Sequence, residues 1–475
     1  MRPMRSVLTV EMLIVCLTLV PAASSRAVRA AAHAGAEAGE TKAVAQDGSA
    51  TAAKQAAGAQ ATTEGTKAKP DDTSGKSVVA VFALNGRLTE KPVAEDFPFG
   101  PTGSESIQTL IERMKKARDD ATVKAVVLLM GHASFGTAQV EEIRTVMDQI
   151  KASGKEIHAH ADSLRTSSLV LLAGASKLSV VPTGDIIVTG IYGEQLYVRN
   201  LLNKIGVTPD FLTCGAYKSA AETFMRSGPS PEAEQMVSWL FDGIYETYVA
   251  LIAQGRGVPT EKVRSWIDHG LYTAEQAKAA GIIDAVEYRQ DFVAELKTRI
   301  GRPITFDRRY GKKKRTDLDF SSPFGMLKIW ADILQGPTAK RSHKAAVAVV
   351  YVDGPIVTGE PTPSPFGDEG IAYSTPIRKA LDEVADDESV KAVVLRVSSP
   401  GGSATASEII LNATRRVKVK KPFAVSMGDV AGSGGYYVAC GADTVFAGRS
   451  TITGSIGVVG GKLATTEMWE RLGVH

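Results

Sequence analysis

The sequence predicts an α/β protein made of two tandem copies of one unit, each on a largely parallel sheet. Runs of β-branched apolar residues alternate with amphipathic segments from about residue 78 onward, which is the pattern of strand–helix–strand units. Two aspartates followed by V-K-A-V-V-L occur twice, starting at Asp119 and at Asp386, which are 267 positions apart. At the same offset I-G-V at 205–207 returns as L-G-V at 472–474. Each copy is expected to run strand, loop, helix, strand, helix, strand, helix, strand.

The composition excludes several classes of protein. With 475 residues, 44% of them apolar, the chain can bury two substantial cores. The 55 basic and 52 acidic residues leave a net charge of +3, so the balance does not suggest a nucleic-acid partner. Its three cysteines, Cys16, Cys214 and Cys440, form no metal-ligand spacing. We therefore expect no disulfide framework, no metal and no cofactor.

The N-terminal segment has the composition of an export signal. Arg2 and Arg5 precede an apolar run over 7–20, which is interrupted by Glu11. Residues 1–30 are therefore expected to be a signal peptide or an N-terminal membrane anchor, and the sequence leaves both open. Residues 31–76 are rich in Ala, Gly and Thr with almost no large apolar side chains, so we expect a disordered tether.

The two copies are predicted at 77–297 and 344–475, joined by 298–343. The first opens with a buried strand over 78–84 and contains a long amphipathic helix over 231–253. The apolar positions of that helix are expected to pack in a core: Met236, Leu240, Ile244 and Tyr248. A second helix is predicted to begin within 270–277, a final strand over 280–286, and a short helix in the connection over 324–334.

Ser433 lies in a glycine-rich stretch at 427–437. An apolar run at 422–426 precedes the stretch, and another follows at 437–440, which predicts a strand, a tight turn and a helix. Ser433 would then stand at a helix N-terminus, whose partial positive charge favours a nearby oxyanion. The stretch fits a nucleophilic serine and equally fits a glycine turn that merely contains one. In the first copy, the positions of Ser433 and the next two glycines are taken by T-S-S at 166–168, so only the second copy keeps these glycines.

A nucleophilic serine needs a base. No histidine lies beside a glycine turn of the second copy, and we expect His158 and His160 to lie on opposite faces of their strand, which argues against a ligand pair. Lys218, between small residues and Tyr217, can serve if burial lowers its pKa from the ordinary value of about 10.4. The alternative is a surface lysine on a turn.

Four motifs together resemble the signal peptide peptidase A (protease IV) family in its long, two-repeat form, over about 78–475. They are G-A-Y-K-S-A at 215–220, V-S-S-P-G-G-S at 397–403, M-G-D-V-A-G-S-G-G-Y-Y at 427–437 and T-G-S-I-G at 453–457. The resemblance implies two Clp-protease/crotonase-like repeats and a dyad split between them. Ser433 would be the nucleophile and Lys218 the base. The backbone N–H groups of Gly402 and Gly434 would form the oxyanion hole, and Ser455 would orient the lysine unless it is only a turn serine.

The resemblance also implies a membrane-associated serine endopeptidase that degrades cleaved signal peptides and similar short hydrophobic peptides. It would act on the outer side of the bacterial inner membrane, as a homo-oligomer. The family's second repeat normally continues beyond the position of residue 475, so we expect this second repeat to be truncated and part of its apolar surface to be uncovered. The alternatives are a catalytically impaired, membrane-tethered scaffold of the same fold, or a crotonase-type enzyme acting on thioesters.

Overall fold

A computed structural model describes residues 77–92, 105–301, 303–312, 344–361 and 370–474. The predicted signal or anchor, the tether and the predicted helix at 324–334 lie outside these ranges. Within them, no helix has both the length and the apolar character needed to cross a membrane.

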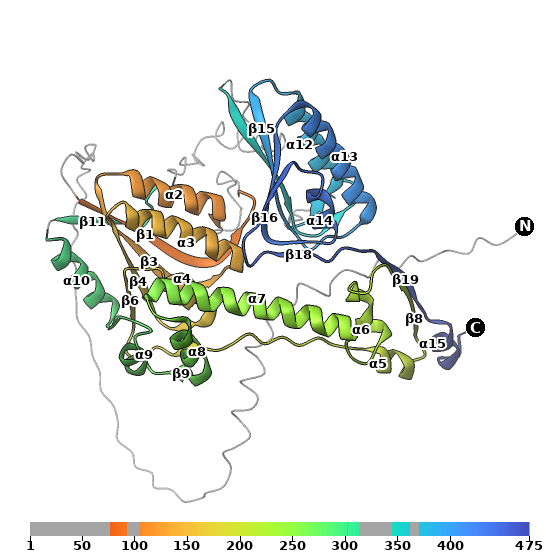
Figure 1. The fold of residues 1–475 in the computed structure, drawn as a ribbon, viewed down its shortest axis with the longest axis horizontal. Coiled ribbons are helices and arrows are strands. Elements are labelled where there is room, and N and C mark those ends of the chain that lie inside the picture. Colours follow the sequence, from red (N-terminus) through yellow and green to blue (C-terminus); the bar gives the residue numbers. More distant parts are fainter. Residues whose placement is uncertain (1–76, 93–104, 302, 313–343, 362–369, 475) are drawn as a thin grey trace, which may run out of the picture. The chain divides into compact units, whose positions relative to one another are not determined.

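The first repeat is built on a parallel sheet with strand order β10-β6-β4-β3-β1-β11, and β2 pairs with β1 (Figure 1). Parallel neighbours require crossover connections, and these are the helices that cover the sheet. The strands are β1 (Ser77–Thr89), β2 (Glu105–Ser106), β3 (Val123–Ser134), β4 (Glu156–Ala161), β6 (Lys177–Val180), β10 (Ala285–Val286) and β11 (Ile304–Asp307). A smaller sheet holds β5 (Leu164–Arg165), β7 (Ile186–Val188) and β9 (Gly270–Tyr272).

Helices cover both faces of the first sheet. One face carries α2 and α3, which contribute Leu110, Met114, Ile143 and Met147 to the main core. The other face is covered by α10, whose Phe292 packs with the strands. The helices are α2 (Ile107–Asp119), α3 (Thr137–Ala152), α4 (Thr166–Leu172), α5 (Arg199–Lys204), a 3₁₀ turn (Ser219–Ala221), α6 (Glu222–Met225), α7 (Pro231–Arg256), α8 (Thr260–His269), α9 (Ala274–Ala280) and α10 (Arg289–Ile300).

The second repeat has its own parallel sheet, in the order β12-β15-β16-β17, with β18 beside β16 (Figure 1). Its core lies between this sheet and helices α12 and α13. The strands are β12 (Ala346–Asp353), β13 (Ile356–Val357), β14 (Ala372–Tyr373), β15 (Val390–Ser399), β16 (Phe423–Gly432), β17 (Thr444–Phe446), β18 (Ile452–Gly454) and β19 (Val459–Ala464). The helices are α12 (Ser374–Asp386), α13 (Ala404–Lys420), α14 (Gly434–Ala439) and α15 (Thr466–Arg471).

The predicted α/β class and the predicted element order are confirmed in both repeats. The helices α3 and α13 begin at the 267-residue offset, and the strands β3 and β15 begin at it as well. The expected strand follows each of these helices: β4 follows α3, and β16 follows α13.

One sheet face is covered in the first repeat and exposed in the second. Val79 and Val81 on β1 are 0% and 2% exposed, because they pack with α10. By strand register their counterparts on β12 are Val347 and Val349, and these are 61% and 42% exposed. Among the described residues, this face of the second sheet therefore presents apolar side chains to solvent.

Some predicted elements differ from those observed. The apolar stripe of α7 was expected in the core, yet all four of its positions are only half-buried and the neighbouring Trp239 is 79% exposed. The helix packs by its C-terminal half, where Val249 and Ile252 are buried. Its N-terminal half extends past the first sheet (Figure 1). In addition, β11 lies in the predicted connection but pairs in parallel with β1, so it belongs to the first sheet.

Candidate active site

Ser433 stands where β16 ends and α14 begins, at the N-cap of that helix. Its φ is +53°, a conformation that L-residues other than glycine rarely adopt and that is found preferentially at functional sites. Its backbone N–H donates a 2.8 Å hydrogen bond to the carbonyl of Gly454, which fixes the turn. The side-chain hydroxyl is therefore presented from a strained and well-anchored strand–helix turn.

Lys218 reaches this serine from the other repeat. It follows β8 (Thr208–Thr213) and the turn after it, and its side chain is buried at 6% exposure. Its Nζ lies 3.0 Å from the Oγ of Ser433, 215 positions away in the sequence. Burial lowers the pKa of the Lys218 amine below its ordinary value. A lysine in such a setting is more readily available in its neutral, proton-accepting form.

Ser455 provides the two other partners of Lys218. The lysine Nζ donates to the Ser455 backbone carbonyl at 2.6 Å and to its Oγ at 3.1 Å. An ammonium group has three N–H donors, whereas a neutral amine has two and one lone pair. Because the two Ser455 oxygens can accept both N–H bonds of the neutral amine, the lone pair is left for the hydroxyl of Ser433. This arrangement permits proton transfer from serine to lysine.

An antiparallel ribbon between the repeats brings the two loops together. Strand β19 pairs with β8 from Val459 opposite Thr213 to Ala464 opposite Thr208, and the N–H of Cys214 donates to the Val458 carbonyl at 2.9 Å. Close approach requires Gly457, because a Cβ there would lie 2.3 Å from the Cys214 carbonyl oxygen. The ribbon thus fixes the lysine loop against the loop that carries Ser455. Sequence reasoning missed this ribbon, since V-G-G-K-L-A has little strand propensity and its partner strand is far away in the chain.

Gly402 and Gly434 place two backbone N–H groups near the serine. Ile356 pairs with the residues on either side of Gly402: its N–H donates to the Gly401 carbonyl, and its carbonyl accepts from the Ser403 N–H. The N–H of Gly402 consequently points away from Ile356. A Cβ on Gly434 would lie 3.1 Å from the Gly402 nitrogen, so the two glycines are in close contact. Gly434 is the first residue of α14, and the N–H of a first helical residue has no partner within its helix.

Comparison with known proteins assigns the chain to a family. The model named "Peptidase family S49" matches residues 149–301 and 415–475. A serine protease SPPA from the chloroplast of Arabidopsis thaliana is 29% identical over 400 residues, 84% of this chain and 56% of that protein. Protease 4 of Haemophilus influenzae is 32% identical over 368 residues, 76% of this chain and 57% of its own length. A Synechocystis protein that is named as a protease is 30% identical over 206 residues, which are 43% of this chain and 72% of that protein.

The chain belongs to peptidase family S49. This is the signal peptide peptidase A (protease IV) family that the four motifs resemble. The chain spans a little over half the length of the first two relatives. The fold of this S49 chain, parallel α/β sheets in two related units, is of the Clp-protease/crotonase type.

The first repeat of this S49 chain has no equivalent of the serine turn. Thr166 stands at the position that corresponds to Ser433, but its hydroxyl donates to the Thr189 carbonyl and accepts from the Thr189 N–H, both at 2.8 Å. Ser168, in the place of a glycine, forms hydrogen bonds with the backbone of Arg165. These hydroxyls stabilise local turns, so the asymmetry between the two repeats seen in the sequence is also an asymmetry of structure.

The expectation for His158 and His160 was wrong. They lie two positions apart on β4, and side chains two positions apart point to the same face of a strand. Both rings contact Phe292 of α10, with centroid distances of 6.5 and 5.1 Å. The His158 ring pairs with Glu156 and the His160 ring with Ser179, so both belong to the packing under α10.

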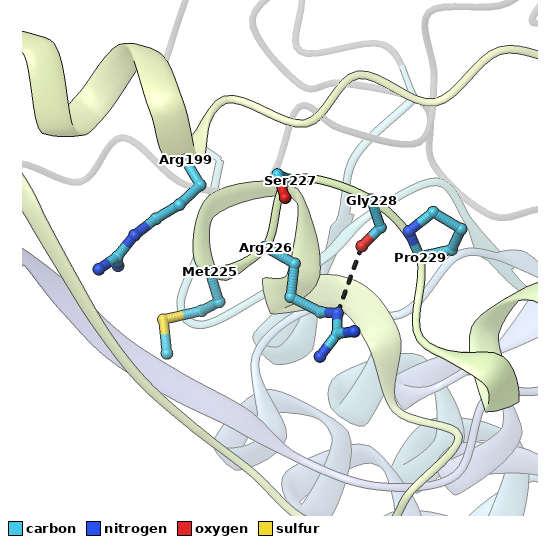
Figure 2. Close-up of a pocket in the computed structure, with 6 residues that line it drawn as sticks. All are labelled: Arg199, Met225, Arg226, Ser227, Gly228 and Pro229. Atoms are coloured by element: carbon cyan, nitrogen blue, oxygen red, sulfur yellow. Dashed lines mark hydrogen bonds between the residues drawn. The ribbon is translucent and has the colours of Figure 1, made fainter.

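A separate pocket of about 510 Å³ lies in the first repeat between α5 and the start of α7 (Figure 2). Figure 2 shows the Arg226 side chain turned toward the Gly228 carbonyl, to which its Nε donates at 3.3 Å. The lining residues are Arg199, Met225, Arg226, Ser227, Gly228 and Pro229. Neither Ser433 nor Lys218 lines this pocket, so it is distinct from the candidate active site.

Proposed function

We propose that the protein is a serine endopeptidase that uses Ser433 as nucleophile and Lys218 as general base. The 3.0 Å contact between Lys218 Nζ and Ser433 Oγ carries this proposal. It is supported by the buried environment of the lysine, which lowers its pKa, and by membership in a peptidase family. A base must lie within hydrogen-bond reach of the proton that it removes, and this lysine does.

The proposed reaction is acyl transfer in two stages. Neutral Lys218 takes the hydroxyl proton of Ser433 while its Oγ attacks the peptide carbonyl carbon. The backbone N–H groups of Gly402 and Gly434 stabilise the oxyanion, and the Lys218 ammonium then protonates the leaving amine. Lys218 next removes a proton from water, which attacks the serine ester. The carboxylate product leaves, and Ser433 recovers its proton from Lys218.

The proposed substrates are cleaved signal peptides and similar short hydrophobic peptides. This part of the proposal rests on the resemblance of the four motifs to signal peptide peptidases. On the same basis we propose that the protein works as a homo-oligomer on the outer side of a bacterial inner membrane. Separation of membranes from soluble extract, followed by detection of the full chain, tests the location.

An active-site-directed serine reagent tests the catalytic proposal. A fluorescent fluorophosphonate is expected to label the wild-type chain at Ser433, and Ser433→Ala is expected to lose both the label and the hydrolysis of a fluorogenic hydrophobic peptide. Thr166→Ala is the matched control, because it removes the corresponding hydroxyl of the first repeat. Unchanged hydrolysis by Ser433→Ala would refute the assignment.

The same experiment separates the alternatives. A catalytically impaired scaffold of the same fold would take up no label at Ser433 and hydrolyse no peptide. A thioester-processing enzyme would bind coenzyme A, which is measured by calorimetry with the same sample. Neither of those functions requires Lys218 Nζ to contact Ser433 Oγ.

A further inference from the structure

Helix α3 of the first repeat begins without a capping side chain of its own. Its N-cap is Gly136, which has no side chain to accept a hydrogen bond from the first turn. At the equivalent place in the second repeat, Ser403 caps α13 by accepting from the Ala406 N–H at 3.2 Å. The backbone N–H groups at the start of α3, which lie in buried residues, must therefore find a partner elsewhere.

That partner is Asp429, which comes from the second repeat. Its carboxylate accepts a 3.2 Å hydrogen bond from the backbone N–H of Gln139 and also interacts with the N–H of Ala138. The carboxylate occupies the space that a side chain at position 136 would need, since a Cβ on Gly136 would lie 1.7 Å from Asp429 Oδ2. Asp429 lies on β16, four positions before Ser433. The strand that delivers the serine is thus bound to α3.

The contact is specific to one repeat. The residue that corresponds to Asp429 in the first repeat is Asp162, which is also an aspartate at the end of a central strand. Asp162 is exposed, whereas Asp429 is half-buried. Burial raises the pKa of Asp429 to about 6, and hydrogen bonds from the Gln139 and Ala138 backbone N–H groups oppose that rise. The strand position alone therefore does not account for the half-buried, hydrogen-bonded carboxylate.

A second contact joins α3 to the loop that holds the lysine. Glu141 accepts hydrogen bonds from the backbone N–H groups of Arg449 and Ser450, both at 3.0 Å, and from the Ser450 hydroxyl. The chain then continues into β18 and reaches Gly454, whose carbonyl holds the Ser433 N–H, and Ser455, whose oxygens hold Lys218.

A third contact joins the first repeat to the strand that leads to Gly402. Arg396 on β15 donates to Glu90 at the end of β1 (2.8 Å) and to Glu142 on α3 (2.6 Å). Glu90 is 4% exposed and also accepts from the Gln139 side chain at 2.8 Å, so the ion pair is buried and continuous with the start of α3. Buried charged pairs of this kind restrict geometry strongly, since removing one partner leaves an unpaired charge.

We propose that α3 is a positioning element for the reaction. The positioning residues that join it to the second repeat are Asp429 of β16 and Glu141 of α3. Through these contacts and the Arg396 ion pairs it fixes the nucleophile strand, the lysine-holding loop and the strand before the oxyanion turn relative to one another. The proposal rests on the proposed peptidase function. It implies that one repeat supplies both the base and the frame against which the other repeat's catalytic groups are aligned.

The test compares five variants with the wild-type chain. Asp429→Ala is expected to lower kcat about 10- to 100-fold while KM stays within about twofold, because misplacement of catalytic groups acts on the chemical step. Asp429→Asn keeps an acceptor oxygen and is expected to retain most of kcat. Gly136→Ala, which displaces the carboxylate, is expected to match Asp429→Ala, and the Gly136→Ala/Asp429→Ala double variant is expected to be no worse than either single one. Asp162→Ala is the matched control and should behave as wild type.

Hydrogen exchange of peptides covering 430–456 provides a readout independent of activity. Faster exchange in Asp429→Ala, with no change in Asp162→Ala, supports the positioning role even if the wild-type chain hydrolyses no peptide and takes no serine label, an outcome that would refute only the peptidase function. The inference is overturned if Asp429→Ala and Gly136→Ala both keep wild-type kcat in an active enzyme. It is equally overturned if exchange over 430–456 is the same in all variants.

Discussion

Ser455→Ala isolates the contribution of one hydroxyl to the state of Lys218, the proposed base. The substitution removes the 3.1 Å contact from Lys218 Nζ to Ser455 Oγ and leaves the 2.6 Å contact to the backbone carbonyl in place. A hydrogen bond of this kind contributes about 1 to 2 kcal/mol. At about 1.4 kcal/mol per factor of ten, kcat is expected to fall roughly 5- to 30-fold. KM should not change, because Ser455 contacts the base rather than the proposed substrate site.

The pH profile of the Ser455→Ala variant gives a second, signed readout. The ammonium form of Lys218 donates to three oxygens, whereas the neutral form needs only the two of Ser455 for its N–H groups. Loss of one acceptor therefore destabilises the charged form more, and the pKa of Lys218 should fall further below its ordinary value. The rising acid limb of kcat against pH is expected to move to lower pH while the plateau falls.

Ser455→Gly separates the hydroxyl from the backbone strain. Ser455 has a φ of +49°, which costs an L-residue about 1 kcal/mol relative to glycine. The glycine variant should therefore lose as much kcat as Ser455→Ala, but it should unfold at a higher denaturant concentration than Ser455→Ala. Ser265→Ala serves as the control, at an exposed serine whose hydroxyl donates to the Lys262 carbonyl. An unchanged plateau in both variants, or an acid limb that moves to higher pH, would refute the orienting role.

Two further predictions concern the whole molecule. Burial lowers the pKa of Lys218, so the unfolded chain holds more protons than the folded one between the folded pKa and about 10.4. The free energy of unfolding should therefore rise with pH across that window. This pH dependence should disappear in Lys218→Met, as measured by denaturation at several pH values. Val79→Ala should destabilise the protein by about 2 kcal/mol, because the residue is 0% exposed. Val347→Ala, at the corresponding position that is 61% exposed, should change stability by less than about 0.5 kcal/mol. Equal effects in urea denaturation would contradict the difference between the two sheet faces.

Most of the fold was predictable because the repeat and the strand patterns are local signals. The V-K-A-V-V-L strands and their offset placed β3 and β15, and the apolar runs around Ser433 placed β16 and α14. The stripe of α7 was misjudged because a 3.6-residue period shows which face is apolar, but not whether anything covers it. Likewise β11 was invisible as part of the first sheet, since its pairing with β1 spans more than two hundred positions.

The candidate site was predictable as a set of residues and not as an arrangement. Motif resemblance indicated Ser433 and Lys218, and the structure brings their side chains into contact. Asp429 lies inside one of the four motifs, but an aspartate near the end of a strand does not by itself predict a role. Its significance depends on Gly136, almost three hundred positions earlier, and no local pattern links the two.

The division of the proposed dyad between the repeats accounts for the many contacts that cross between them. Lys218 and Ser433 come from different repeats, so the 3.0 Å distance between Nζ and Oγ is set by the interface rather than by either core. The β8–β19 ribbon fixes the lysine loop from one side, while α3 fixes the serine strand and the 449–455 segment from the other. Since Ser455 belongs to the same segment, the positions of both Lys218 and Ser433 depend on contacts with α3. A change at Gly136 or Glu141 should therefore act on the chemistry without contacting substrate, serine or lysine.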